Sequence, residues 1–125
     1  MITGRVSAHR EPVVPLRLRG PSGQELAIEA VVDTGFNGHL TLPPSLIAAL
    51  GFPFRRHARA VLGDGSPIMF DIHEAVVLWE GSPRRVPVDA ANTDPLLGMG
   101  LLHGHELLVQ AVEGGDVSIK ALRLA

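Results

Sequence analysis

The chain has 125 residues, no cysteine, and 11 Lys and Arg against 13 Asp and Glu, so its formal net charge is −2 with neutral histidines. This length fits one domain over residues 1–125, and 46% hydrophobic residues suffice for a core, which excludes intrinsic disorder. The nearly balanced charge argues against nucleic acid or an anionic membrane as the main partner. The missing cysteines exclude a disulfide framework, a thiol nucleophile and zinc-ribbon or iron–sulfur sites.

Targeting and membrane signals are not evident in the sequence. The first residues, 1–5, lead into polar ones without the apolar stretch of a signal peptide. No apolar run approaches the ~20 residues that a membrane helix needs. Together with the absence of cysteine, these features predict a soluble protein of the reducing cytoplasm.

Glycine and proline, 14 and 10 residues, punctuate the chain without a period, which is typical of many short segments joined by turns. Between the turns lie β-branched stretches of alternating polarity, which predict strands. The first two strands are joined by a Pro-plus-Gly turn at 20–23, and a later hairpin has its tip at 63–65. The predicted strands are 13–18, 25–32, 58–62, 68–79, 86–90, and a last hairpin of 107–112 with 117–122.

Two short helices fit the remaining pattern. Pro44 in a first turn, Leu46 and Leu50 four residues apart, and Gly51 just beyond predict the first helix. Residues 98–103, followed by Gly104, predict the second. The chain therefore reads as a single, mostly β domain, which we expect to be closed or nearly closed because an open sheet of this many strands leaves adhesive edges.

The segment 30–38, Ala-Val-Val-Asp-Thr-Gly-Phe-Asn-Gly, is the most informative in the chain. Asp33 comes directly after an apolar strand, where burial of its carboxylate would be costly, and Gly35 permits a sharp turn just after it. An Asp in this position also starts ordinary turns through a side-chain bond to the backbone. A second element, 94–102, lies about sixty residues downstream and reads Asp-Pro-Leu-Leu-Gly-Met-Gly-Leu-Leu.

These two elements together resemble the retropepsin-like aspartic proteases. In that family one strand ends in Asp-Thr-Gly, here Asp33-Thr34-Gly35, and a later apolar-apolar-Gly segment, here Leu96-Leu97-Gly98, leads into a short helix. The resemblance extends over nearly the whole domain. It implies an all-β, retropepsin-like closed barrel with a flap hairpin and one or two short helices.

The sequence departs from the retroviral pattern at three positions. Retroviral members place Ala and then Asp after the Gly, and an Arg after the later Gly; here these positions hold Phe36, Asn37 and Met99. The Asp and the Arg form an ion pair in retroviral members. Both are replaced here, so no buried charge is left without a partner. Bacterial and archaeal members with Asp-Thr-Gly-Phe-x-Gly look more similar to this chain.

The resemblance implies an aspartic endopeptidase that acts on an extended peptide or protein. Two carboxylates must share one proton, and the chain has a single Asp-Thr-Gly, so the implied enzyme is a homodimer with Asp33 of each chain as catalytic residue. It implies no cofactor and no metal. A non-catalytic module that kept the fold for binding or dimerisation is the alternative, because a fold does not guarantee a function.

The resemblance also assigns roles around Asp33. Thr34 would bond across the dimer and Gly35 would let the substrate backbone approach. Phe36 would lie beside a substrate subsite, or alternatively point into the core. Substrate would also meet the hairpin tip, which is otherwise an ordinary β-turn, at Gly63, Asp64 and Gly65.

The histidines, the tryptophan and the last hairpin each allow more than one interpretation. His103 and His105, with His57 and His73 elsewhere, suggest a metal site only weakly, because surface histidines are more often solvated. Trp79 is expected in the core or an interface. The last hairpin is expected either to form part of the dimer interface or to be buried within its own chain; its apolar residues are Leu107, Leu108, Val109, Val112, Val117, Ile119, Leu122 and Leu124.

Overall fold

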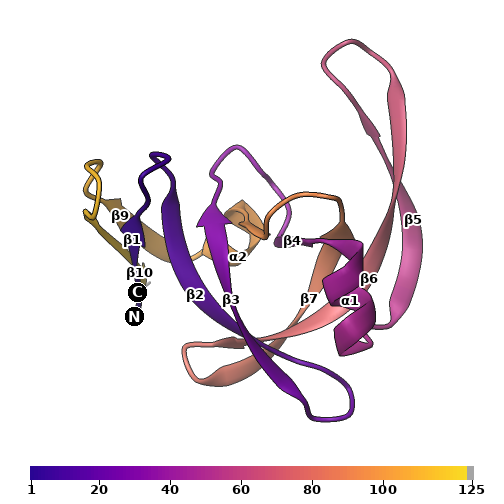
Figure 1. Cartoon of the computed structure of the whole chain (residues 1–125), viewed down its shortest axis with the longest axis horizontal. Helices are drawn as coiled ribbons and strands as arrows, with labels where there is room; N and C mark the ends of the chain where they lie inside the picture. The colour runs from indigo at the N-terminus through magenta and orange to yellow at the C-terminus, as the bar shows by residue number, and fades with distance from the viewer. Residues whose placement is uncertain (124–125) are drawn as a thin grey trace.

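The computed structural model describes residues 1–123 and is mostly β (Figure 1). Its all-β class agrees with the expectation from the sequence. Its elements in chain order are β1 (Ile2–Val6), β2 (Pro12–Arg19), β3 (Glu25–Val32), β4 (Leu40–Leu42), α1 (Pro44–Leu50), β5 (Phe54–Val61), β6 (Pro67–Trp79), β7 (Ser82–Ala90), β8 (Leu96–Leu97), α2 (Met99–Leu102), β9 (His105–Val109) and β10 (Asp116–Ala121).

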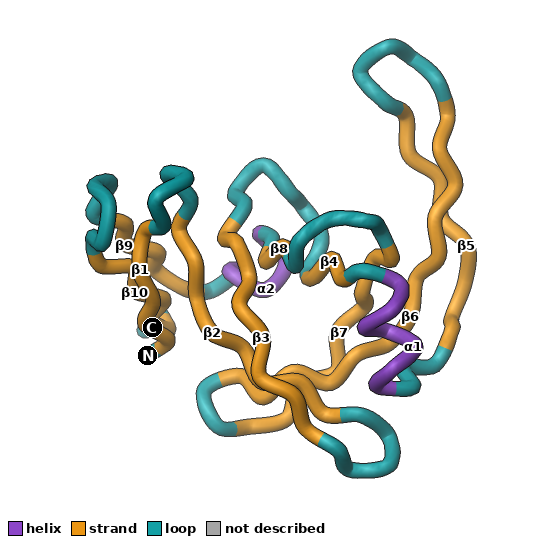
Figure 2. The backbone as a smooth tube through the Cα atoms, viewed as in Figure 1, coloured by secondary structure: helices purple, strands orange, loops and turns teal. Residues whose placement is uncertain are grey.

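The strands pair in the order β5-β6-β7-β4-β8-β3-β2-β1-β10-β9, and β2 pairs with β6 as well. The extra pairing joins Arg17–Arg19 to Val76–Leu78 where the two strands cross. Figure 2 shows these strands curving around a common interior, while the β5–β6 hairpin extends beyond the other strands. The free edges of the described sheet are β5 and β9.

The two-residue strand β8 lies between β3 and β4. It runs parallel to β3, with Leu97 opposite Val32, and antiparallel to β4, with Leu97 also opposite Leu40. All three of these residues are buried, because apolar side chains on paired positions project to the same face of the sheet. The segment after Asp94 is thus fixed against the end of β3, although about sixty residues separate them in sequence.

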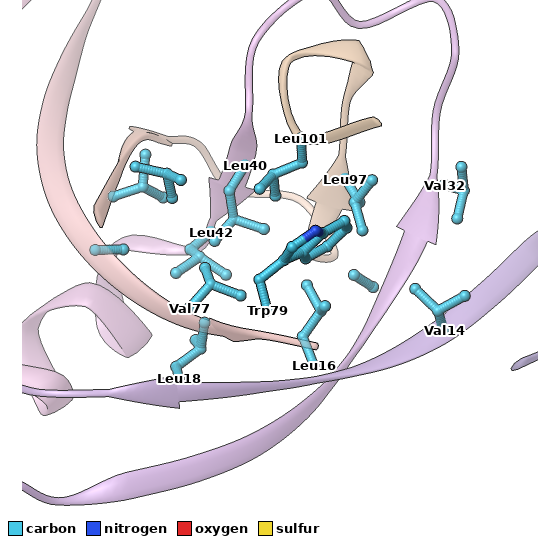
Figure 3. Packing of buried hydrophobic residues seen from close by; sticks show 14 of the residues in the cluster. Val14, Leu16, Leu18, Val32, Leu40, Leu42, Val77, Trp79, Leu97 and Leu101 are labelled. Atoms are coloured by element: carbon cyan, nitrogen blue, oxygen red, sulfur yellow. The ribbon is translucent and has the colours of Figure 1, made fainter. Parts of the chain in front are cut away.

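The interior is filled by the inward-facing residues of the strands. Trp79 is only 7% exposed and lies among leucines from several strands, as Figure 3 shows. Its indole N–H donates a hydrogen bond of 3.1 Å to Nε2 of His105, so the polar end of the ring also has a partner. Of the two locations expected for Trp79, the structure assigns it to the core.

Helix α1 has the predicted ends, Pro44 and Leu50. Gly51 adopts a left-handed conformation with φ of 69°, and Phe52 N–H donates to the carbonyl of Ile47 across the helix end. Glycine is favoured there because it has no Cβ to clash in that conformation. The helix buries Ile47 and Leu50 and so covers part of the core.

Several boundaries differ from those predicted. Strand β5 begins at Phe54 and not at 58, β7 begins at Ser82 and not at 86, and α2 is shorter than 98–103. Strand β9 ends at Val109, short of the predicted 112. The extra residues of β5 and β7 are mostly exposed and show no alternation of buried and exposed side chains, so the sequence pattern did not mark them as strand. Their pairing with β6 keeps them extended.

The terminal strands pair within the chain. Strand β1, which was not among the predicted strands, lies between β2 and β10, and β10 also pairs with β9. Val117 and Ile119 are buried, whereas Leu108, Val109, Val112 and Leu122 are exposed. Leu124 lies outside the described residues. Among residues 1–123, no helix is long and apolar enough to cross a membrane.

Candidate functional site

Asp33 lies directly after β3, in a turn that the backbone fixes on both sides. Its N–H donates to the carbonyl of Leu97 at 2.9 Å, which extends the β3–β8 pairing by one residue. Its carbonyl accepts from the N–H of Phe36 at 3.2 Å. The side chain is half-buried, so the carboxylate is held at the end of a strand and remains accessible to solvent.

One carboxylate oxygen of Asp33 is used within the loop. Oδ1 accepts a hydrogen bond of 2.9 Å from the N–H of Gly35. This is the bond of an ordinary Asx turn, and it also fixes the rotation of the carboxyl group. Oδ2 accepts no hydrogen bond from the described residues. Thr34 and Gly35 are exposed at the top of this turn.

Three backbone hydrogen bonds attach the rest of the loop to the segment after β8. Met99 N–H donates to Phe36 at 2.8 Å, Gly98 N–H to His39 at 3.0 Å, and Gly100 N–H to the carbonyl of Gly38 at 2.9 Å. The two elements that the sequence analysis singled out are therefore in direct contact. Such a network restricts the positions open to the Asp33 carboxylate.

The ring of Phe36 packs against two glycines of this network. A Cβ on Gly98 would lie 2.5 Å from Cδ2 of Phe36, and a Cβ on Gly38 would lie 2.5 Å from Cζ of the same ring. Phe36 is half-buried in this position. Its ring thus covers the contact between the Asp33 loop and the segment after β8.

The predicted hairpin tip lies apart from this loop. Gly65 N–H donates to Leu62, Leu62 N–H to Ser66, and Gly65 has φ of 85°, which defines a three-residue turn with a glycine in the left-handed region. Asp64 accepts bonds from Ser66 Oγ and N–H, which lower the pKa of its carboxyl. Figure 1 shows the tip of the β5–β6 hairpin beyond the other strands and separate from the end of β3.

A groove of about 790 Å³ lies between the β6 strand of this hairpin, α1 and the β7–β8 connection. Apolar residues from α1 and β6 make up much of its wall, and Asp71, His73 and Asp89 also line it. Asp33 does not line this groove in the single chain. One lining residue, Leu96, relates the groove to Asp33. It pairs with Val31, which lies two residues before Asp33 in the chain.

Strand pairing connects the groove to the Asp33 loop by a continuous row of residues. Paired positions project to the same face of a sheet, and every second residue of a strand shares a face, so Asp33 continues the face of Val31. In order across the sheet, the row is Val31, Leu96, Thr41, Asp89, Ile72 and Arg56. Three of these residues, Leu96, Thr41 and Asp89, also line the groove.

Two titratable groups near this row have shifted pKa values. Burial raises the pKa of Asp89, against the opposing effect of the nearby Arg56 and His39. Burial lowers the pKa of His39, with a further lowering by Arg84 and an opposite effect of Asp89. Each group thus favours its neutral form more than it does in water.

Three of the four histidines considered for a metal site, His57, His73 and His105, have hydrogen-bond partners. With Nε2 of His105 accepting from Trp79, its Nδ1 carries the proton and donates to the carbonyl of His103 at 3.0 Å. His73 Nδ1 lies 2.9 Å from the carbonyl of Phe52, and His57 Nδ1 lies 2.8 Å from Asp71. Among residues 1–123, no group of three or more potential ligands is arranged to hold a metal ion.

Comparison with known proteins finds no family model and no curated protein that matches this chain. The function must therefore be inferred from the residues and their arrangement. Sequence reasoning singled out Asp33 and its loop but missed the groove and Asp89. The signal for Asp89 was its charge inside the predicted strand 86–90, where it alternates with the buried Val86 and Val88.

Proposed function

We propose that this chain is an aspartic endopeptidase of the retropepsin-like type, active as a homodimer. The observation that carries the proposal is the attachment of the Asp33 loop to the Leu97–Gly100 segment by backbone hydrogen bonds. Attachment of this kind gives a carboxylate a defined place at the end of a strand, with one oxygen fixed by Gly35. Fixed positions of reacting groups are a main source of enzymatic rate enhancement.

The sheet topology also supports the expectation of a closed barrel with a flap hairpin. Because β2 pairs with β6 in addition to β1 and β3, strands β2, β3, β8, β4, β7 and β6 follow one another by pairing and return to the first. A ring of pairings is the pattern of a closed barrel. The long β5–β6 hairpin stands outside this ring in the manner of a flap (Figure 2).

The proposed dimer supplies the second carboxylate. A two-fold axis beside the exposed turn of Asp33 and Thr34 brings the same residues of two chains together, which is the isologous arrangement that most homodimers have. Two carboxylates about 3 Å apart cannot both ionise, so the pair shares one proton. Its two apparent pKa values then belong to the pair.

The proposed reaction uses this shared proton. The ionised Asp33 takes a proton from a water molecule as the water oxygen attacks the scissile carbonyl carbon, and the protonated Asp33 of the partner subunit donates to the carbonyl oxygen. The tetrahedral intermediate then collapses as the newly protonated Asp33 donates its proton to the amide nitrogen, the C–N bond breaks, and a hydroxyl of the intermediate returns a proton to Asp33 of the partner subunit. Thr34 and Gly35 keep their proposed roles beside the carboxylates, and the tip at Gly63–Gly65 closes over the extended peptide as an added strand.

The test is the digestion of an unfolded-protein or peptide library by the purified protein from acidic to neutral pH. We expect Asp33→Asn to abolish cleavage while circular dichroism and sedimentation stay as in the wild type, because Asn has nearly the same shape. Asp94→Asn, an exposed residue outside the groove, is the matched control and should cleave normally. Cleavage by the Asp33→Asn protein at the wild-type rate would refute the mechanism.

The second candidate is a non-catalytic binding or dimerisation module. It is favoured by the absence of Asp33 from the lining of the groove that the single chain forms. Peptide binding without cleavage, unaffected by Asp33→Asn, would support this module and exclude the peptidase.

A further inference from the structure

The groove beside the hairpin contains a carboxylate that the proposed reaction does not use. Asp89, near the end of β7, is half-buried and lines the groove. It pairs in register with Thr41 on one side and with Ile72 on the other. Within the described part of the chain, its carboxylate forms no hydrogen bond and no ion pair.

The rest of the groove is largely apolar and contains no Lys or Arg. Its other carboxylate, Asp71, is already paired with His57 at 2.8 Å. The nearest cation along the row, Arg56 on β5, is exposed, does not line the groove and makes no ion pair with Asp89. The apolar walls include Ile47, Phe52, Ile68, Met69 and Leu96.

We propose that this groove binds the side chain of a Lys or Arg residue of the peptide substrate, with Asp89 as the partner of the cationic group. The inference rests on the proposed peptidase function. A Lys or Arg side chain has an apolar stem and a charged end, which matches apolar walls around one carboxylate. A half-buried carboxylate without a partner gains more from such a pair than an exposed one does, because less solvent screens it.

The position of the groove relates this residue to the bond that is cut. Leu96 lines the groove and pairs with Val31, and Asp33 follows two residues later on the same face. An extended peptide that crosses the Asp33 turn and lies under the β5–β6 hairpin therefore passes the groove within a few residues of the scissile bond. Asp89 is thus a specificity-determining residue, separate from the catalytic Asp33.

The test maps cleavage sites in a peptide library by mass spectrometry at neutral pH. Wild type should enrich Lys and Arg at one position near the cut bond, and Asp89→Asn should lower that enrichment by about tenfold. Asp94→Asn, the same change at an exposed position outside the groove, should keep it. Cleavage without a basic preference, or a preference that survives Asp89→Asn, would overturn the inference and leave the peptidase standing.

A binding measurement separates the two proposals if no cleavage occurs. An array of short random peptides, each made with Lys and again with Gln at one position, is probed with wild type and with Asp89→Asn. Tighter binding of the Lys members that disappears in Asp89→Asn supports the groove even if the peptidase proposal fails. Equal binding of Lys and Gln members overturns it.

Discussion

The ring of Phe36 occupies the space that a side chain on Gly98 would need. A Cβ at position 98 would also approach the carbonyl oxygens of Phe36 and Gly38, although the backbone of Gly98, with φ of −103° and ψ of −179°, suits any residue. Glycine is needed at this position because a side chain would not fit, and not because the backbone conformation requires it. The contact joins the Asp33 loop to the segment after β8.

Gly98→Ala should therefore destabilise the protein by about 1–3 kcal/mol, the usual cost of an overfilled site. The double variant Phe36→Ala/Gly98→Ala should recover only part of this loss, because the backbone oxygen of Gly38 cannot move away as a side chain can. Urea denaturation of the single and the double variant measures both effects. Gly63→Ala, at a position with open space around its Cα, is the control. A wild-type midpoint for Gly98→Ala would contradict the packing argument.

Phe36→Ala separates a structural from a substrate-binding role of this ring. Because the ring is half-buried against glycines, its loss should cost about 1–2 kcal/mol, less than the ~3–5 kcal/mol of a fully buried Phe. If Phe36 also limits a subsite, the cleavage profile should shift toward larger side chains by about tenfold. Thermal melts and cleavage maps of the same protein give both answers. An unchanged profile with a lowered melting temperature rules out the subsite role.

Asp89 gives a pH dependence of stability whose sign follows from its raised pKa. The folded state binds the Asp89 proton more tightly than the unfolded chain does, and this difference stabilises the fold. The stabilisation is complete below the ordinary Asp pKa of about 3.9 and is lost as the pH rises through the pKa of Asp89 in the folded state. Asp89→Asn should therefore raise the melting temperature at neutral pH and leave it unchanged in strong acid. Melting curves across pH measure the difference, and a variant less stable than wild type at neutral pH would refute the argument.

The dimer can be tested at the free edge of β9. Leu108 is 45% exposed on this strand, which pairs only with β10. If the terminal segments contribute to the interface, Leu108→Arg should weaken dimerisation at least tenfold, as measured by sedimentation. The control is Leu26→Arg, 40% exposed on β3. A stable wild-type monomer at micromolar concentration, with activity linear in protein, would exclude the shared carboxylate pair.

Local features of this protein could be predicted from the order of its residues. Alternating polarity predicted the long strands β2, β3 and β6, and Pro44 with Gly51 predicted α1 at its observed bounds, because these signals act between residues close in the chain. Asp33 was singled out because the Asp-Thr-Gly after an apolar strand occurs together with the Leu96-Leu97-Gly98 element downstream, the combination that carries the family resemblance.

The relationships between distant segments could not be predicted in this way, because they depend on how the strands pair in the folded chain. Strand β1 alternates in burial but has only five residues, and it is held in the sheet by pairing with β2 on one side and β10 on the other. The groove and the row from Val31 to Arg56 likewise depend on the register of six strands, which no local pattern encodes. Asp89 becomes a candidate binding residue only through this register, because pairing with Thr41 and Ile72 half-buries its carboxylate on the face that Asp33 shares.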